Sequence, residues 1–569
     1  MRDICKEPVR HAKEQVEQLI AAAARKATQA GQLPECALPA FTVEIPADAA
    51  HGDFAANAAM VGARAYRMPP VKIAHILLEN LAFEDRSFFA RAEVAGPGFL
   101  NFFLRPDWFV LVLNSVLQLK DAYGKTDYGQ GEKIMVEFVS ANPTGPMHMG
   151  NARGGMIGDC LAAAMEASGY DVTREFYVND AGNQIEKFGL SLEARYLQIY
   201  KGEAAVPFPE DGYHGADIMD RAREFAALQG DAFVETSAEE RRAALVGYAL
   251  PHNIVAMRET LQAYRIEYNQ WFHESTLHES GAVQRAVDLL TERGLAYESE
   301  GAVWYKATAM GAEKDEVLVR QNGSPTYFAA DIAYHYNKFV QRGFDRVIDV
   351  WGADHHGHVA RLKGAMDAIG VSGDKLDIVL MQLVRLMKDG EPYRMSKRSG
   401  RSVTLEDLLD MVPVDAARFM FNMREPNSTM DFDLDLAVQQ SVENPVYYVQ
   451  YAHARICSIL RKLNEDGIAP RECTNEELKR LTAPEEIELI RVMARFPGAV
   501  INAATRYDPA SLTHYAQELA ALVHKFYTTC RVRVEDETLM QARICLCICC
   551  RTTVANILNL MKISVPERM

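Results

Sequence analysis

The stretch that most constrains the fold is an apolar run followed by a Pro- and Gly-rich loop and then a helical pattern. Residues 134–139 are almost all apolar, as a buried parallel strand requires. Residues 142–146 end that strand, because proline and glycine break both ladders and helices. After His148 apolar residues recur at helical spacing up to Gly169, a residue type typical of C-caps. With a second strand at residues 171–178, the stretch predicts a strand–loop–helix–strand unit of an α/β fold.

Polar residues crowd the junction between this strand and this helix. A helix N-terminus has free backbone N–H groups and a positive dipole end, which favour phosphate binding. His148 adds a donor there, and Gly150 lets a base or phosphate approach the backbone. Glu137 lies inside the apolar strand, and a buried carboxylate predicts a cationic partner or a ligand. A structural turn with a hydrogen-bonded histidine is the alternative, and the density of polar residues argues against it: Glu137, Ser140, Asn142, His148 and Asn151.

Length and composition predict a soluble protein of several domains. The 569 residues exceed one typical domain, and roughly two to four domains are expected. The apolar share is 49%, no apolar run approaches the roughly 18–20 residues of a membrane helix, and the start of the chain does not resemble a signal peptide. The net charge of −16 argues mildly against a nucleic-acid partner, although a local basic face is compatible with it.

Cysteine usage favours a reducing cytoplasm. Ten cysteines are scattered without the spacing of a disulfide framework. Four of them cluster in an apolar helical stretch as Cys545, Cys547, Cys549 and Cys550. Because their spacing is not that of a zinc site, we interpret them as buried structural cysteines.

Further strand and cap signals follow in the second half of the chain. Residues 347–351 and 378–386 are apolar runs typical of buried strands. Thr404 is expected to cap a helix, with Asp407 as its capping-box partner. From residue 414 onwards the pattern is almost entirely helical. These signals predict a second half of the sheet followed by a helical region.

Three segments of the second half combine polar residues with element ends. Tyr327 and Asp331 are four residues apart at a helix start and share one face; an acid favoured by the helix dipole is the alternative. Segment 352–358 places Asp354 and three histidines after a strand, where they would splay, so metal binding is the minor interpretation. Segment 393–400 combines lysine, arginines, serines and glycine, which suit a polyphosphate clamp or, alternatively, a basic surface loop.

Two of these segments resemble signatures of class I aminoacyl-tRNA synthetases. The letters HMGN at residues 148–151 resemble the HIGH motif, and residues 394–398 resemble the KMSKS loop. The longer phrase at residues 139–154 is similar to the arginyl-tRNA synthetases of the bacterial type in particular. The sequence departs from these motifs at Asn151 for the second histidine, Arg394 for the first lysine and Arg398 for the last serine.

The resemblance implies a class I Rossmann-like fold of three parts. Residues 1–120, with a phrase HGDFAAN that we interpret as a helix start, resemble an N-terminal α+β domain that contacts tRNA. Residues 121–410 resemble the catalytic domain with its parallel sheet, including an insertion at about 190–300. Residues 411–569 resemble an all-α anticodon-binding bundle, whose aromatic run near residue 448 would otherwise be core packing.

The resemblance also implies an activity. It is that of an ATP-dependent ligase which converts L-arginine to arginyl-adenylate and transfers it to the 3′ end of tRNA(Arg). ATP would be a substrate with Mg²⁺ shared by its phosphates, and no residue is expected to hold a metal of its own. A cytoplasmic monomer without membrane contact is expected, and tRNA is expected to be required for arginine activation.

Individual roles are carried over at matching positions. The catalytic positions are His148, Asn151 and Lys397. ATP binding adds Gly150, Gly352, Met395 and Ser396 to those three. Two carboxylates and a phenol, which suit a planar guanidinium, are Glu274, Asp331 and Tyr327. The remaining arginine-binding positions, at the α-amino end, are Glu137, Ser140, Asn142 and Asp354.

Two rival functions stay open at this point. A nucleotidyltransferase of the same superfamily would be shorter and would lack the helical C-terminal third. A non-catalytic tRNA-binding paralogue is compatible with Asn151 and Arg394, although the other motif residues are intact. Adenylate formation distinguishes the enzyme from such a paralogue.

Overall fold

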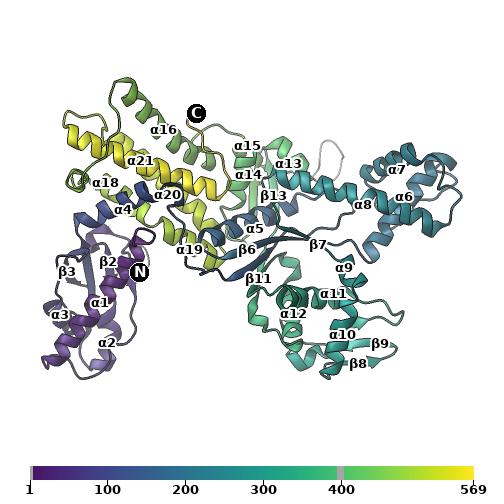
Figure 1. The fold of residues 1–569 in the computed structure, drawn as a ribbon, viewed down its shortest axis with the longest axis horizontal. Coiled ribbons are helices and arrows are strands. Elements are labelled where there is room, and N and C mark those ends of the chain that lie inside the picture. The colour runs from purple at the N-terminus through teal and green to yellow at the C-terminus, as the bar shows by residue number, and fades with distance from the viewer. Residues whose placement is uncertain (1–3, 394–402) are drawn as a thin grey trace.

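The computed structural model describes residues 4–393 and 403–569. The molecule is elongated, with a sheet-centred body in the middle (Figure 1). An N-terminal unit and a C-terminal helical bundle lie together at one end, and a helical projection lies at the other.

The central body is built on a five-stranded parallel sheet with the strand order β12-β11-β5-β6-β7. Its strands are β5 (Lys133–Glu137), β6 (Asp171–Val178), β7 (Gln270–His273), β11 (Arg346–Gly352) and β12 (Leu376–Met381). From β5 the chain adds β6 and β7 on one side of the sheet and later adds β11 and β12 on the other side, so the direction in which strands are added reverses between β5 and β11. Ligands of open α/β sheets bind at the carboxyl ends of the strands beside such a point.

The predicted strand–loop–helix–strand unit is confirmed by β5, α5 (Gly150–Ala167) and β6. Strand β5 is buried on both faces, with Met135 and Val136 wholly inaccessible, which explains its unbroken apolar run. A Cβ atom on Gly158 would lie 2.2 Å from Cγ of Phe138, so only glycine lets α5 pack this closely on the end of β5.

The N-terminal unit packs three helices on an antiparallel sheet of order β1-β2-β4-β3. The prediction that residues 51–57 begin a helix is wrong. This segment contains strand β2, and α2 begins only at Ala58. Pairing with β4 and the edge-on contact of Phe54 with Phe89 hold this segment extended. The elements are α1 (Pro8–Gln29), β1 (Val43–Glu44), β2 (Phe54–Ala56), α2 (Ala58–Tyr66), α3 (Pro70–Asn80), β3 (Phe89–Ala95), β4 (Phe99–Leu104) and the connecting α4 (Pro106–Leu119).

Two appendages leave the central sheet, and between them the chain returns to it as β7. The first is the helical projection, with its own apolar core, and consists of α6 (Asn183–Lys201), α7 (Ala216–Gln229) and α8 (Ala238–Ala263). The second has another core and a small antiparallel sheet, and it consists of α9 (Ser275–Glu279), α10 (Ala282–Glu292), β8 (Ala296–Ser299), β9 (Ala302–Tyr305), β10 (Glu316–Val319), α11 (Tyr327–Tyr336) and α12 (His356–Ala368).

The predicted single strand at residues 378–386 is wrong, because the chain changes sheets within it. Strand β12 ends at Met381, and the chain bends at Leu383, which is 82% exposed. The next strand joins a separate sheet made of β13 (Val384–Lys388), β14 (Glu391–Pro392) and β15 (Met430–Asp433). An apolar run cannot reveal such a change of partner.

The C-terminal region is helical, as predicted, apart from β15. The capping box between Thr404 and Asp407 is also confirmed, at the start of the first of its helices. The principal helices are α13 (Leu405–Met411), α14 (Val414–Phe421), α16 (Pro445–Glu465), α18 (Pro484–Ala494), α19 (Phe496–Arg506), α20 (Ala510–Thr529) and α21 (Glu537–Leu560).

Helix α21 corrects the expectation that no segment approaches the length and apolarity of a membrane span. By length and composition alone it could cross a membrane, and 61% of its most apolar window is buried within the protein. Its four cysteines are buried and free, which confirms their interpretation as structural residues. In this fold α21 is a core helix of the bundle.

One buried carboxylate joins the C-terminal segment to the central body. Asp159 of α5 is wholly inaccessible, and it accepts hydrogen bonds from Arg418 at 2.5 Å and Lys562 at 2.8 Å. Arg174 of β6 lies 3.3 Å away. Burial alone would raise the pKa of Asp159, but the three cations outweigh it and lower that pKa. Helix α5 is therefore fastened to the sheet and to the bundle through the same charge.

Candidate active site

The predicted nucleotide-binding loop lies at the carboxyl end of β5, beside the point where the strand order reverses. Two backbone hydrogen bonds of 2.9 and 3.0 Å pair residues 147–149 with residues 403–405. Residues 403–405 directly follow the predicted polyphosphate loop, whose Met395, Ser396 and Lys397 lie outside the described residues. Residues 403–405 are thus fastened beside the HIGH-like segment.

His148 presents a hydrogen-bond donor at the start of α5. Its Nδ1 accepts the backbone N–H of Gly150 at 3.0 Å, so the proton of the neutral ring is on Nε2. Partial burial of the ring lowers the pKa of His148 and favours this neutral form. An Nε2–H group beside a helix N-terminus can donate to a phosphate oxygen.

Gly150 and Asn151 complete this end of the helix. Gly150 is exposed as the first residue of α5, where its backbone is open to a ligand. Asn151 is half-buried, and its backbone N–H donates to the His148 carbonyl at 2.9 Å. Within residues 4–393 and 403–569 its side-chain amide has no hydrogen bond, which leaves its donors for a ligand.

Glu137 has the cationic partner that its burial predicted. The side chain of Glu137 is the last of β5, and its Oε2 accepts from Lys338 at 2.6 Å. Its Oε1 accepts from the Ser140 hydroxyl at 2.8 Å, and that hydroxyl also accepts the Tyr177 N–H at 3.2 Å. Ser140 is therefore held between β5 and β6, while Asn142 is exposed in the loop beyond it.

Two carboxylates from different elements lie at the other predicted part of the site. Glu274, between β7 and α9, lines a cavity of about 540 Å³ together with Tyr327. Asp331 lies one helical turn after Tyr327 on α11. Each carboxylate contacts a histidine: Glu274 Oε1 is 3.3 Å from His278 Nε2, and Asp331 Oδ2 is 3.0 Å from His358 Nε2.

The electrostatics of this cavity favour a bound cation. Glu274 is only 3% exposed, and burial raises its pKa. Hydrogen bonds from His278 and Tyr177 lower that pKa, whereas the charge of Asp331 raises it further. A cationic ligand would relieve the repulsion between the two carboxylates and stabilise both in the ionised state.

The end of β11 supplies the last predicted residues. Gly352 is half-buried, and a Cβ atom there would lie 2.3 Å from Oδ1 of Asp354. Asp354 is exposed and lies 3.6 Å from His355, whereas His358 turns away towards Asp331. In the part of the chain that the structure describes, no three His, Cys, Asp or Glu side chains converge on a metal position. His355 and His358 thus face different carboxylates, in line with the predicted splaying.

Comparisons with known proteins match this geometry to a family. A family model described as "tRNA synthetases class I (R), catalytic domain" matches residues 112–459, more than half of the chain. Models described as "Arginyl tRNA synthetase N terminal domain" and "DALR anticodon binding domain" match residues 14–104 and 449–569.

The chain belongs to the arginyl-tRNA synthetases.

Relatives support this family along the whole chain. An arginine–tRNA ligase of Acetivibrio thermocellus is 52% identical over 557 residues, which cover 98% of this chain and 99% of the relative. One of Caldanaerobacter subterraneus is also 52% identical, over 99% of both chains. Among solved structures, a putative arginyl-tRNA synthetase of Campylobacter jejuni is 32% identical, with a TM-score of 0.73 over 82% of this chain and all of that one. The Thermus thermophilus enzyme, 23% identical with a TM-score of 0.75, covers 98% of this chain and all of that one and shares the fold.

As an arginyl-tRNA synthetase, the protein ligates arginine to tRNA(Arg) at the expense of ATP. Its catalytic part is the class I parallel-sheet fold described above, and the DALR bundle is its tRNA-binding anticodon domain. This excludes the shorter nucleotidyltransferase.

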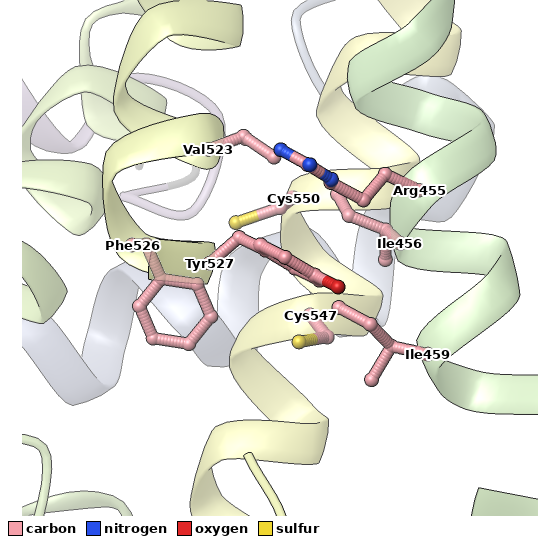
Figure 2. A pocket seen from close by; sticks show the side chains of 8 residues that line it. All are labelled: Arg455, Ile456, Ile459, Val523, Phe526, Tyr527, Cys547 and Cys550. Carbon is pink, nitrogen blue, oxygen red and sulfur yellow. The ribbon is translucent and has the colours of Figure 1, made fainter. Parts of the chain in front are cut away.

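The DALR bundle carries an aromatic surface at the predicted run near residue 448. Figure 2 shows Arg455 beside Tyr527, and its guanidinium carbon is 4.0 Å from that ring centroid. Arg455 also lies 5.1 Å from the ring centroid of Tyr451 and 3.1 Å from Nδ1 of His524. The small pocket beneath, of about 10 Å³, has at most the volume of one water molecule. This region therefore presents stacked rings and a cation rather than a small-molecule cavity.

Sequence reasoning missed the partners of the site residues. Lys338, His278 and His358 each contact a predicted carboxylate, and Asp180 accepts hydrogen bonds from the backbone and hydroxyl of Ser275. Lys338 is the one lysine of residues 327–341, a mostly apolar and aromatic segment, and this was the available signal for it. The contact of His358 with Asp331 depends on packing between α11 and α12, whereas Glu274 and His278 are four residues apart, a spacing that was the available signal for that pair.

Proposed function

We propose that arginine binds with its guanidinium between Glu274 and Asp331, and with Tyr327 as a further hydrogen-bond partner. The observation that carries this proposal is a carboxylate only 3% exposed at the wall of a 540 Å³ cavity, with a second carboxylate whose charge it feels. A guanidinium has a planar fork of donors that can pair with two carboxylates, whereas lysine would leave acceptors unpaired. Discrimination against lysine follows from this geometry.

The α-amino end of arginine would lie at the carboxyl ends of β5 and β11. Ser140, Asn142 and Asp354 are the proposed contacts, and Glu137 shapes this end through its hydrogen bond with Ser140. Their support is that β5 and β11 are adjacent in the sheet, so the loops after them open on the same crevice.

ATP would lie across the N-terminus of α5. The Nε2–H group of His148 and the free amide of Asn151 are the proposed phosphate donors, and the adenine would lie over Gly150 and near Gly352. Lys397, with Met395 and Ser396, is the proposed phosphate contact from the loop outside the described residues. Mg²⁺ bound to the phosphates would stabilise their charge.

The chemistry then needs alignment more than covalent participation by the protein. An oxygen of the arginine carboxylate attacks the α-phosphorus of ATP, the bond to the β-phosphate breaks, and pyrophosphate leaves. The 2′-hydroxyl of the terminal tRNA adenosine next attacks the arginyl carbonyl, and AMP leaves. His148, Asn151 and Lys397 would stabilise phosphate charge during the first step.

The test is arginine-dependent exchange of pyrophosphate into ATP, with and without tRNA for arginine and with lysine as the control amino acid. Exchange that requires both arginine and tRNA is expected. No exchange from folded protein that still binds tRNA would mean that the phosphate site is disabled. Asn151→His and Arg394→Lys would then be the first reversions to test.

Asp331→Asn tests the guanidinium assignment directly. The variant keeps the side-chain volume but removes one of the two charges that pair with the substrate. Loss of a charge-assisted contact with the substrate is expected to raise the arginine KM by about 10²-fold, with the ATP KM nearly unchanged. Glu298→Gln, which changes an exposed carboxylate of β8, is the control. An unchanged arginine KM in Asp331→Asn would exclude this position for the substrate.

We also propose domain boundaries at residues 1–120, 121–410 with an insertion at about 190–300, and 411–569, in a cytoplasmic monomer. The separate apolar core of the projection supports an insertion that folds around its own contacts. Light scattering coupled to size-exclusion chromatography tests the monomer. A mass twice the 63.5 kDa of the chain would contradict it.

A further inference from the structure

Three buried carboxylates lie side by side near the carboxyl end of the central sheet. Asp349 of β11 is in register with Glu137 of β5, and Glu137 is in register with Glu175 of β6. Side chains at the same register of parallel strands point to the same face, so the three form a row across the central strands. Asp349 and Glu175 are wholly inaccessible and Glu137 is 6% exposed, so each requires a cation.

Lys338 bridges two members of this row. It is wholly inaccessible and lies in a π-helical turn, Asn337–Gln341, that continues α11; such turns are rare and recur at functional sites. Its Nζ donates to Glu137 at 2.6 Å and to Asp349 at 3.0 Å. Burial opposes the charge of Lys338, but Asp349 and Glu137 outweigh burial and raise its pKa.

The same helical segment also supplies hydrogen-bond partners to Asp349 and Glu175. His335 Nε2 lies 2.9 Å from Asp349, and Arg342 forms two hydrogen bonds of 2.5 and 2.7 Å with Glu175. Asp331 belongs to the same helix, and its carbonyl oxygen is 2.8 Å from Nδ1 of His335. The row therefore fixes the helix that carries a proposed guanidinium ligand onto the strands that carry the α-amino end.

Glu137 connects Lys338 to the proposed arginine site. Its second oxygen holds the hydroxyl of Ser140, in a segment where Val139 and Ser140 have φ angles of 73° and 40°. Such angles are costly for residues with side chains, and a β-branched valine is disfavoured most, so the segment needs support from its surroundings. Burial raises the pKa of Glu137 above its ordinary value, and the charge and hydrogen bond of Lys338 oppose that rise.

We propose that Lys338 is a positioning residue for arginine, which acts by holding the Glu137 carboxylate in place against Ser140. Lys338 does not touch the substrate in this account. It keeps the strained segment after β5 in the geometry that receives the α-amino end. The inference rests on the proposed assignment of Ser140 and Glu137 to the arginine site.

Arg342 provides a matched control on the same helical segment. It forms an equally close pair with the next carboxylate of the row, although its own side chain is 24% exposed. The Glu175 carboxylate, however, accepts a hydrogen bond from Tyr334 rather than from a side chain of the loop after β5. Arg342→Met should therefore destabilise the fold, because Glu175 stays buried without its cation, and leave the arginine KM unchanged.

The experiment measures KM values for arginine and ATP by pyrophosphate exchange, together with thermal midpoints. Lys338→Met and Glu137→Gln are each expected to raise the arginine KM about tenfold, with the ATP KM unchanged. Because both act through one contact, the double variant is expected to show about tenfold rather than about a hundredfold. The proposal would be overturned if the two single-variant increases in arginine KM multiplied in the double variant, or if Arg342→Met raised the arginine KM equally. Lys338 would then have a purely structural role.

Two further measurements keep the outcomes separate. If Lys338→Met does not fold, the double variant, which removes both charges of the pair, replaces it and is compared with Glu137→Gln alone. An arginine KM that is a further tenfold higher in the double variant than in Glu137→Gln would overturn the proposal. Asp331→Asn is measured in parallel. An unchanged arginine KM in Asp331→Asn would refute the site itself, whereas a raised value there with an unchanged value in Lys338→Met would refute only the positioning role.

Discussion

Asp159→Asn removes a single negative charge from the centre of the molecule while it preserves the shape of the side chain. In the native protein Asp159 balances Arg418, Lys562 and part of the charge of Arg174. Arg418 is 1% exposed, and its remaining hydrogen bonds go to backbone carbonyls and a methionine sulfur. The variant therefore leaves a buried guanidinium without a counter-charge.

The surroundings set the size of the effect. Removal of one partner from a buried ion pair typically costs about 3–5 kcal/mol. Lys562 is 32% exposed and can be solvated, and Arg174 keeps Glu166 at 2.5 Å, so Arg418 alone bears the full cost. We expect a loss of about 3 kcal/mol in the free energy of unfolding of the central body, at the lower end of that range.

Urea unfolding followed by the fluorescence of Trp271 and Trp351 measures this loss, because both lie on strands of the central sheet. Glu166→Gln is the matched control: Glu166 also pairs with Arg174 from α5, but it is 43% exposed. An exposed pair contributes about 0–1 kcal/mol. The reasoning would be refuted if Asp159→Asn cost less than about 1 kcal/mol, or if the control cost as much.

Two other predictions concern acid stability and catalysis. The pKa of Asp159 in the folded protein lies below its unfolded value of about 3.9, so its stabilisation is present above that value and is lost as pH falls through the folded pKa. In urea titrations the difference in the free energy of unfolding between wild type and Asp159→Asn should stay constant down to about pH 5 and become smaller below about pH 4. A difference that grows in acid would contradict the sign of this pKa shift. His148→Ala should lower the maximal rate of pyrophosphate exchange about 10²-fold, while His148→Gln, which keeps a donor, recovers part of it. Equal losses in both variants would argue against a donor role.

The central unit could be predicted because its signals are local. The apolar run of β5, the Pro- and Gly-rich loop and the helical spacing of α5 lie within about one supersecondary unit of sequence, and each signal agrees with the final fold. The capping box at Thr404 is local in the same sense, since both of its partners lie within one helical turn.

The failures share a different cause. Residues 51–57 are extended because β4, about 45 residues later, pairs with them. The run at 378–386 splits because β15 offers a second partner. Lys338 was missed as the partner of Glu137 because 201 residues separate them. In each case the deciding contact is made by a distant segment, and composition within a window carries no record of it.

Lys562 follows helix α21, far along the chain from α5, yet it completes the charge balance of the helix on which the proposed ATP site begins. During synthesis the sheet, α5 and both appendages leave the ribosome long before this lysine does. The nascent chain therefore lacks one of the counter-charges of Asp159 until the segment after α21 has been synthesised. Chains that stop just before this point would have every residue proposed to touch arginine or ATP and still lack one of the supports of the catalytic core.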